Sequence, residues 1–237
     1  MWLDTSMKKL TADRNYSRSE ILSFLHESNP ELSDNSMDWL IYRLISEKKL
    51  FRTSRDSYSL TDLELLPEYK PLYSDQALAL ISYLAKRFSE LNYVVFESTL
   101  LNEFLNHQIA KNTIYLQVEK EVSSVVHETL RNEYSKNILL TPGKKEMEFY
   151  WEEGCVVIIN LISQAPINIK NPHHITLEKL LVDIMADKSI SSSFSLAELP
   201  DIYKIAGSMY RLDKNKLIRY AGRRGKKEEA EKYLEGI

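Results

Sequence analysis

Residues 17–61 read SRSEILSFLHESNPELSDNSMDWLIYRLISEKKLFRTSRDSYSLT, and this stretch decides the fold of the N-terminal part of the chain. It contains two runs of apolar residues at helical spacing. Each run follows short polar residues that cap helices, Ser17 or Ser19 for the first and Ser33 or Asp34 for the second. Residues 50–53 and 57–60 then alternate as strands around a short turn. The stretch therefore predicts two short helices followed by a tight β-hairpin.

The order helix, turn, helix and hairpin resembles a winged helix-turn-helix. In that motif the second helix enters the major groove of DNA and the wing contacts the backbone. The apolar stripe between Met37 and Ile45 leaves an opposite polar face on the second helix. We expect that face and the wing to bind duplex DNA, through Asn35, Ser36, Trp39, Tyr42, Arg43, Arg52 and Arg55. Asn35 and Arg43 suit base edges, whereas Arg52 and Arg55 suit phosphate.

Two observations favour a different use of the same motif. Winged helices usually carry a glycine just before the first wing strand and another at the wing tip, where this chain has Lys48-Lys49 and Asp56-Ser57. Residues 1–60 also hold nine basic and nine acidic side chains. A DNA-binding domain is usually more basic, because neutralising phosphates supplies much of its affinity. A winged helix that serves packing or protein contact is therefore the alternative.

The remaining chain predicts an α+β fold, with an α/β layer that has an antiparallel part and a helical C-terminal region. Strands are expected at 93–97, 112–119 and 137–140, and residues 146–150 and 155–162 are expected to pair as a hairpin. Helices are expected at 75–89, 99–106, 123–131, 176–186, 196–208, 213–220 and from about 226. Two prolines in residues 65–71 indicate a linker. The expected domains are 1–66, 72–170 and 171–237.

Composition places the chain among ordinary soluble proteins, with 43% apolar and 27% charged residues in 237. Its single cysteine, Cys155, lies in an apolar run, so we expect a buried thiol and a reducing, cytoplasmic setting. No apolar stretch approaches the roughly 20 residues that a membrane span requires. We therefore expect a cytoplasmic protein without a membrane partner.

Charge is divided unevenly along the chain. The net charge is −3, but residues 61–201 carry −8 and residues 202–237 carry +5. The basic residues of the last segment form a candidate partner patch, made of Lys216, Arg219, Arg223, Arg224, Lys226 and Lys227. Like charges repel, so this patch predicts an anionic partner. The candidates are the acidic central part of the chain itself, DNA phosphates, or an acidic face of another protein.

Two C-terminal segments resemble the antitoxins of the abortive-infection E system. Residues 175–183, ITLEKLLVD, are similar to the start of a conserved helix in that family, and residues 215–224, NKLIRYAGRR, are similar to its late Leu-x-x-Tyr-Ala-x-Arg segment. The resemblance implies a bacterial type IV toxin–antitoxin system. It implies an N-terminal winged helix that represses the protein's own operon, and a function that counters a nucleotidyltransferase-like toxin. It implies no enzyme activity.

The residues themselves also predict no enzyme. The segment TPGKK at 141–145 lacks the glycine and the Ser/Thr of a phosphate-binding loop, and His173-His174 have no partner at metal-ligand spacing. We expect no cofactor and no metal. The one enzymatic alternative is nuclease-like, with Glu97, Glu119 and Glu121 at strand ends and Lys144 or Lys145 beside them. Residues 178–183 are expected to supply surface charges or local ion pairs.

Overall fold

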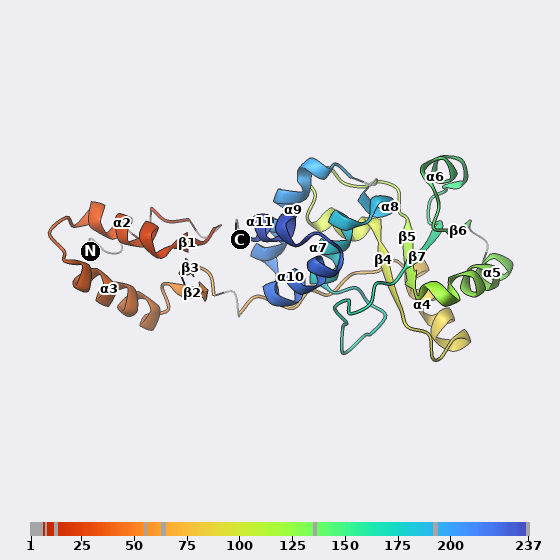
Figure 1. Ribbon diagram of the computed structural model, residues 1–237, viewed down its shortest axis with the longest axis horizontal. Helices are drawn as coiled ribbons and strands as arrows, with labels where there is room; N and C mark the ends of the chain where they lie inside the picture. Colours follow the sequence, from red (N-terminus) through yellow and green to blue (C-terminus); the bar gives the residue numbers. More distant parts are fainter. Residues whose placement is uncertain are drawn as a thin grey trace.

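The protein has an α+β fold in which a small N-terminal unit precedes a larger mixed sheet covered by helices. The computed structural model describes residues 7, 9–11, 14–54, 56–62, 65–134, 137–191 and 194–235. Figure 1 shows the N-terminal unit at one end of an elongated molecule, with the mixed sheet and most of the helices beyond it. The buried apolar residues of the N-terminal unit form a core cluster of their own.

The N-terminal unit contains the two helices and the hairpin expected from the sequence. Helix α2 spans Arg18–Ser28 and α3 spans Asp34–Ser46. Strands β2 (Phe51–Ser54) and β3 (Ser57–Ser59) form the hairpin, and β1 (Tyr16–Ser17) adds a third antiparallel strand in the order β1-β3-β2. Ser17 begins α2 with a reciprocal capping box to Glu20, and Ser33 caps α3. The caps therefore lie where the sequence placed them.

The connection between α3 and the hairpin has an unusual backbone conformation. Lys48 has φ 54°, in the left-handed region that favours glycine. The amides of Lys49 and Leu50 both donate to the carbonyl of Leu44, which closes the end of α3. Lys48 thus takes the conformation that a glycine usually provides before a wing, and the chain turns there without one.

The larger part is organised around a four-stranded sheet. Its strands are β4 (Tyr93–Glu97), β5 (Ile114–Val118), β6 (Ile138–Leu140) and β7 (Val156–Asn160), in the order β4-β5-β7-β6. Strand β4 is antiparallel to β5, whereas β5, β7 and β6 run parallel. The carboxyl ends of the three parallel strands therefore lie at one edge of the sheet.

Helices cover both faces of this sheet. One face packs against α4 (Asp75–Arg87) and α5 (Ser123–Glu133). The other packs against the C-terminal helices, which are α7 (Leu177–Ala186), α8 (Lys188–Ser191), α9 (Leu199–Met209), α10 (Lys214–Arg223) and α11 (Lys227–Leu234). Short 3-10 turns lie at Ser98–Glu103, Lys120–Val122 and Leu196–Glu198. The central strands are buried on both faces, as parallel strands in layered folds are.

Two of the sequence expectations were wrong. Residues Lys144–Tyr150 form helix α6 instead of a strand, and β7 pairs in parallel with β5 and β6 instead of forming a hairpin with residues 146–150. The run KKEMEFY begins with strong helix formers. Its segment Glu-Met-Glu-Phe alternates polar and apolar residues as a strand does, and this alternation led to the wrong prediction. Residues 99–106 were expected to be helical, and the structure has the 3-10 helix Ser98–Glu103 there, which ends three residues earlier than expected.

Within the described residues, none of the helices combines the length and the apolar character needed to cross a membrane.

Candidate functional sites

The first candidate site is the exposed face of α3. Asn35 and Arg43 are exposed on it, and Ser36 is half-buried. Trp39 is 59% exposed and Tyr42 is 70% exposed, which is unusual for such large aromatic side chains. The helix therefore presents most of the residues that the sequence assigned to DNA, while Leu40 and Leu44 face the core.

Acidic neighbours neutralise part of that face. The Nε of Arg43 donates to Oε1 of Glu47 at 2.7 Å, and its guanidinium lies 5.7 Å from the ring centroid of Trp39. Hydrogen bonds from Arg43 and Lys49 hold the pKa of Glu47 below its usual range. Asp38 forms an ion pair with Arg18 of α2. Arg43 is thus already paired in the free protein.

The β2–β3 hairpin contributes one arginine among the described residues. Arg52 lies on β2 opposite Tyr58 of β3 and is exposed. Arg55, the other wing residue assigned to DNA, lies outside the described residues.

The second candidate site is the C-terminal basic patch, whose residues have acidic or polar partners nearby. Lys216 pairs with Asp213 at 3.2 Å, Lys226 with Glu229 at 2.7 Å and Lys227 with Glu231 at 3.7 Å. Arg223 donates to the Ser163 hydroxyl at 2.7 Å. Arg219 is exposed. Local acids therefore offset much of the positive charge.

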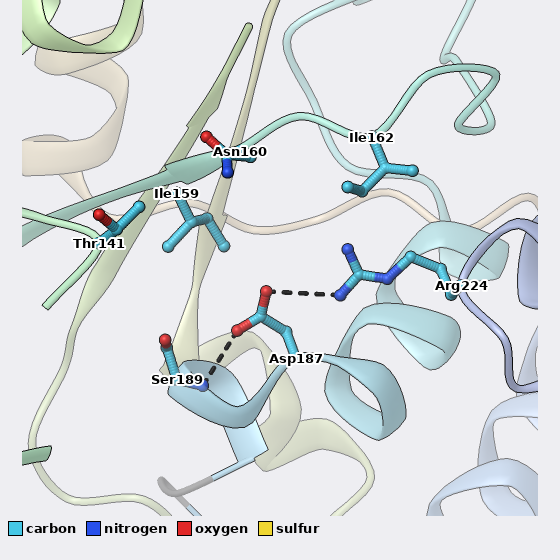
Figure 2. A pocket seen from close by; sticks show the side chains of 7 residues that line it. All are labelled: Thr141, Ile159, Asn160, Ile162, Asp187, Ser189 and Arg224. Carbon is cyan, nitrogen blue, oxygen red and sulfur yellow. Dashed lines mark hydrogen bonds and ion pairs between the residues drawn. The ribbon is translucent and has the colours of Figure 1, made fainter. Parts of the chain in front are cut away.

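Arg224 differs from the rest of the patch because its side chain is only 12% exposed. Its Nη2 donates to Asp187 at 3.4 Å, and its Nε lies 3.9 Å from Asp183. Figure 2 shows the guanidinium reaching Asp187, whose other carboxylate oxygen accepts from the amide of Ser189. Arg224 thus joins α10 to α7 and to the start of α8.

Behind Arg224 lies a buried charge network that the sequence did not predict. Lys179 and Asp183, expected at the surface or in a local ion pair, form an ion pair at 2.7 Å with side chains 1% and 2% exposed. Tyr220 and Gln117 donate to Asp183 at 2.7 and 2.8 Å. Burial alone would raise the pKa of Asp183, but the charges of Lys179 and Arg224, together with the hydrogen bonds from Gln117 and Lys179, hold that pKa below the usual range.

Two hollows lie at the carboxyl ends of the parallel strands. The smaller, of about 240 Å³, is the one in Figure 2, where Thr141, Asn160, Ile162 and Arg224 surround it. The larger, of about 780 Å³, shares Asn160 and Ile162 with it and extends along the loop 161–172 to Tyr93, Glu119, His173 and Arg223. The two arginines at the end of α10 therefore line adjacent cavities.

Backbone strain marks the same edge. Thr141, directly after β6, has φ 42°, and Gln164, in the loop after β7, has φ 60°. Left-handed conformations are costly for residues other than glycine, above all for β-branched ones, and they cluster at functional sites.

The structure does not bring the proposed nuclease residues together. Glu97 pairs with Ile114 at one end of the β4–β5 ladder, whereas Glu119 follows the opposite end, where Tyr93 pairs with Val118. Glu97 is buried and accepts hydrogen bonds from the amide and hydroxyl of Ser74 at the start of α4. Among the described residues, no three His, Cys, Asp or Glu side chains are grouped to hold a metal ion.

Cys155 is fully buried, as the sequence predicted, and burial raises the pKa of its thiol. The thiol is therefore protonated and shielded rather than poised as a nucleophile.

Comparison with curated proteins finds no match. Residues 36–237, from within α3 to the end of the chain, match a family whose description is "Family of unknown function (DUF6577)". Because this match covers most of the sequence, the protein belongs to the DUF6577 family.

Proposed function

We propose that the protein is a cytoplasmic DNA-binding repressor of the antitoxin type, which binds the operator of its own operon and counters a nucleotidyltransferase-like toxin. The observation that carries the proposal is the N-terminal unit, in which a strand, two capped helices and a hairpin leave one face of α3 exposed. This is the order of a winged helix-turn-helix. The proposal assigns no catalytic activity to the chain.

The side chains on α3 and β2 suit a duplex. Asn35 and Arg43 carry the donors and acceptors that read adenine and guanine edges in the major groove, and Arg52 is placed on the wing for phosphate. Only the Nε of Arg43 donates to Glu47, so its terminal nitrogens can still reach a base edge while the ion pair is kept. The carboxylate of Glu47 nevertheless repels phosphates, and this lowers the affinity for DNA of any sequence.

The antitoxin part of the proposal rests on the two similar C-terminal segments. In the structure they become α7 and α10, which pack together, and Lys179, Asp183 and Tyr220 from these segments meet in the buried network. The similar residues therefore hold a helix pair in place. These residues support a fold of this region that is shared with the antitoxins, and we infer the antitoxin function from that shared fold.

Promoter binding by purified full-length protein tests the DNA-binding part. Measured by fluorescence anisotropy, Arg43→Ala should weaken binding to the upstream DNA by about 1–3 kcal/mol. Arg52→Ala should weaken binding to all sequences alike, because it contacts phosphate. Glu47→Gln should tighten binding, since it removes a negative charge. Arg87→Ala on α4 is the matched control and should bind as the parent does. Unchanged affinity in both Arg43→Ala and Arg52→Ala would exclude this interface.

A protein-binding role for the same face is the second candidate. Its specific support is the exposure of Trp39 and Tyr42, because aromatic side chains are enriched at the centres of protein interfaces. Under this reading, Trp39→Ala and Tyr42→Ala abolish capture of the protein encoded by the adjacent gene. The parent would then show no preference for its own promoter.

A further inference from the structure

The larger hollow lies where layered α/β sheets place ligands. It opens beyond the carboxyl ends of β5 and β7, which are neighbouring parallel strands, and next to the amino end of antiparallel β4. Crevices outside the carboxyl ends of strands are the usual binding position in such sheets. Its volume of about 780 Å³ is that of a pocket for a small molecule. Gln164 holds its strained conformation in the loop that borders it.

One wall of the hollow is aromatic. The rings of Tyr93 and His173 are stacked, with centroids 3.8 Å apart and an interplanar angle of 3°. The backbone fixes His173, since its carbonyl accepts from the amide of Val95 at 2.9 Å and its Nδ1 lies 3.2 Å from the carbonyl oxygen of Tyr93. Tyr93 is buried beneath it. The half-buried imidazole thus covers Tyr93 with one face, and it belongs to the lining of the hollow.

Side chains of both charge signs also line the hollow. Arg223 is exposed, and its contact with the Ser163 hydroxyl places its guanidinium at the rim. Lys120 adds a second cation, and Glu119 and Glu121 add two carboxylates. Two cations beside two carboxylates would bind a bare polyanion poorly. They suit a ligand that has both an anionic group and hydroxyl donors.

The remaining lining completes that description. Apolar side chains occupy the loop side of the hollow, including Leu161, Ile162 and Pro166. The amide of Asn160 provides a donor and an acceptor that match the edge of a heterocycle, and Asn92, whose Nδ2 donates to Glu119 at 3.0 Å, adds its amide oxygen as an acceptor. Planar apolar surface, edge hydrogen bonds, hydroxyls and an anion are together the features of a nucleotide.

We propose that the hollow at the carboxyl ends of β5 and β7 is a mononucleotide-binding site. The base stacks on His173, Arg223 and Lys120 bind the phosphates, and the carboxylates of Glu119 and Glu121 accept hydrogen bonds from the ribose hydroxyls. The site lies on the sheet and not on α3, so it is independent of the DNA-binding proposal.

Isothermal titration calorimetry of the full-length protein tests the site with ADP and its two halves, adenosine and pyrophosphate. ADP should bind, and each half should bind at least about tenfold more weakly, because each loses either the phosphate contacts or the stacking contact. Arg223→Gln should weaken ADP binding by roughly tenfold, the effect of losing one charge-assisted hydrogen bond. Arg219→Gln, an exposed arginine of the same helix that does not line the hollow, should bind ADP as the parent does.

His173 provides the second arm. His173→Phe keeps a flat ring and should retain ADP binding, whereas His173→Ala should lose at least about fivefold. A circular dichroism spectrum checks that each variant is folded. If His173→Ala does not fold, the comparison of Arg223→Gln with Arg219→Gln still decides the matter. Absence of ADP binding up to about 1 mM, equal binding of ADP and pyrophosphate, or equal effects of the two arginine changes would each overturn the proposal.

Discussion

At the scale of single residues, Lys48 shows how a side chain can occupy a position usually held by glycine. Its φ of 54° costs about 1–2 kcal/mol for an L-residue, and glycine avoids that cost while losing about 0.5–1 kcal/mol of conformational entropy. Lys48→Gly should therefore raise the free energy of unfolding of the N-terminal unit by a few tenths to about 1 kcal/mol. Urea denaturation followed by tryptophan fluorescence measures the change.

The neighbouring lysine is the matched control for Lys48→Gly. Lys49 is not among the residues with positive φ. Lys49→Gly therefore relieves no strain but raises the conformational entropy of the unfolded chain, so it should destabilise the unit. A Lys48→Gly variant that is as destabilised as Lys49→Gly would show that the turn gains nothing from glycine.

Residue-scale features of the candidate sites were predictable only where partners are close in sequence. The caps at Ser17 and Ser33 follow from local patterns, and the Arg43–Glu47 pair has the i, i+4 spacing of a helix ion pair. The partners of Arg224 lie on α7 and at its end, far away in sequence. No local pattern connects them, because the contact depends on how α10 packs on α7.

At the scale of elements, α6 and β7 show the limit of periodicity in short segments. The run 155–162 was correctly predicted to contain a strand, but the strands that pair with it were not predicted. The sequence of a buried strand does not show whether it pairs in parallel or antiparallel. The Gly154 turn resembled a hairpin signal, and it has positive φ as a turn glycine does. In the structure α5 connects β5 to β6 and α6 connects β6 to β7, and such helical connections allow neighbouring strands to run parallel.

The buried ion pair between Lys179 and Asp183, which lies within α7 and contacts Tyr220 of α10, can be tested by a double-mutant cycle. Lys179→Met should lower the free energy of unfolding by about 3–5 kcal/mol, because it leaves Asp183 buried without its nearest cation. Asp183→Leu alone should cost a similar amount. The double variant should cost clearly less than the sum, since no unpaired charge remains. Additive costs in urea denaturation would show that the pair is not coupled.

The same pair predicts a dependence on pH. The folded-state pKa of Asp183 lies below its value in the unfolded chain, so its contribution is complete above about pH 4 and is lost as the pH falls through the folded-state pKa. The parent should therefore lose its stability advantage over the Asp183→Leu variant below about pH 4. If the stability advantage of the parent stayed constant down to about pH 2.5, which is well below the ordinary pKa of an aspartate, Asp183 would not be ionised in the folded protein as proposed.

At the scale of the whole molecule, the uneven charge along the chain is partly resolved by folding. Arg224 pairs with Asp183 and Asp187, and Arg211 pairs with Glu68 at 2.7 Å, so basic residues of the last segment meet acids of the preceding one. Pairing with acids of the same chain is one of the three outcomes that the sequence left open for these basic residues. Composition could not select it, because net charge reports the sign of a segment and not which atoms approach one another.

The N-terminal unit and the larger part should also unfold as separate cooperative units. Leu44 is fully buried in the core of the N-terminal unit, and Leu180 is fully buried in the core between the sheet and the C-terminal helices. Removing either side chain leaves a cavity that costs about 2–5 kcal/mol. Differential scanning calorimetry of the full chain should show two transitions. Leu44→Ala should lower the midpoint of one and leave the other in place, and Leu180→Ala should do the reverse.

A single transition that both variants lower would mean that the two cores unfold together. DNA binding by α3 would then depend on the integrity of the whole chain, and the domain boundary near residue 66 would have no thermodynamic meaning.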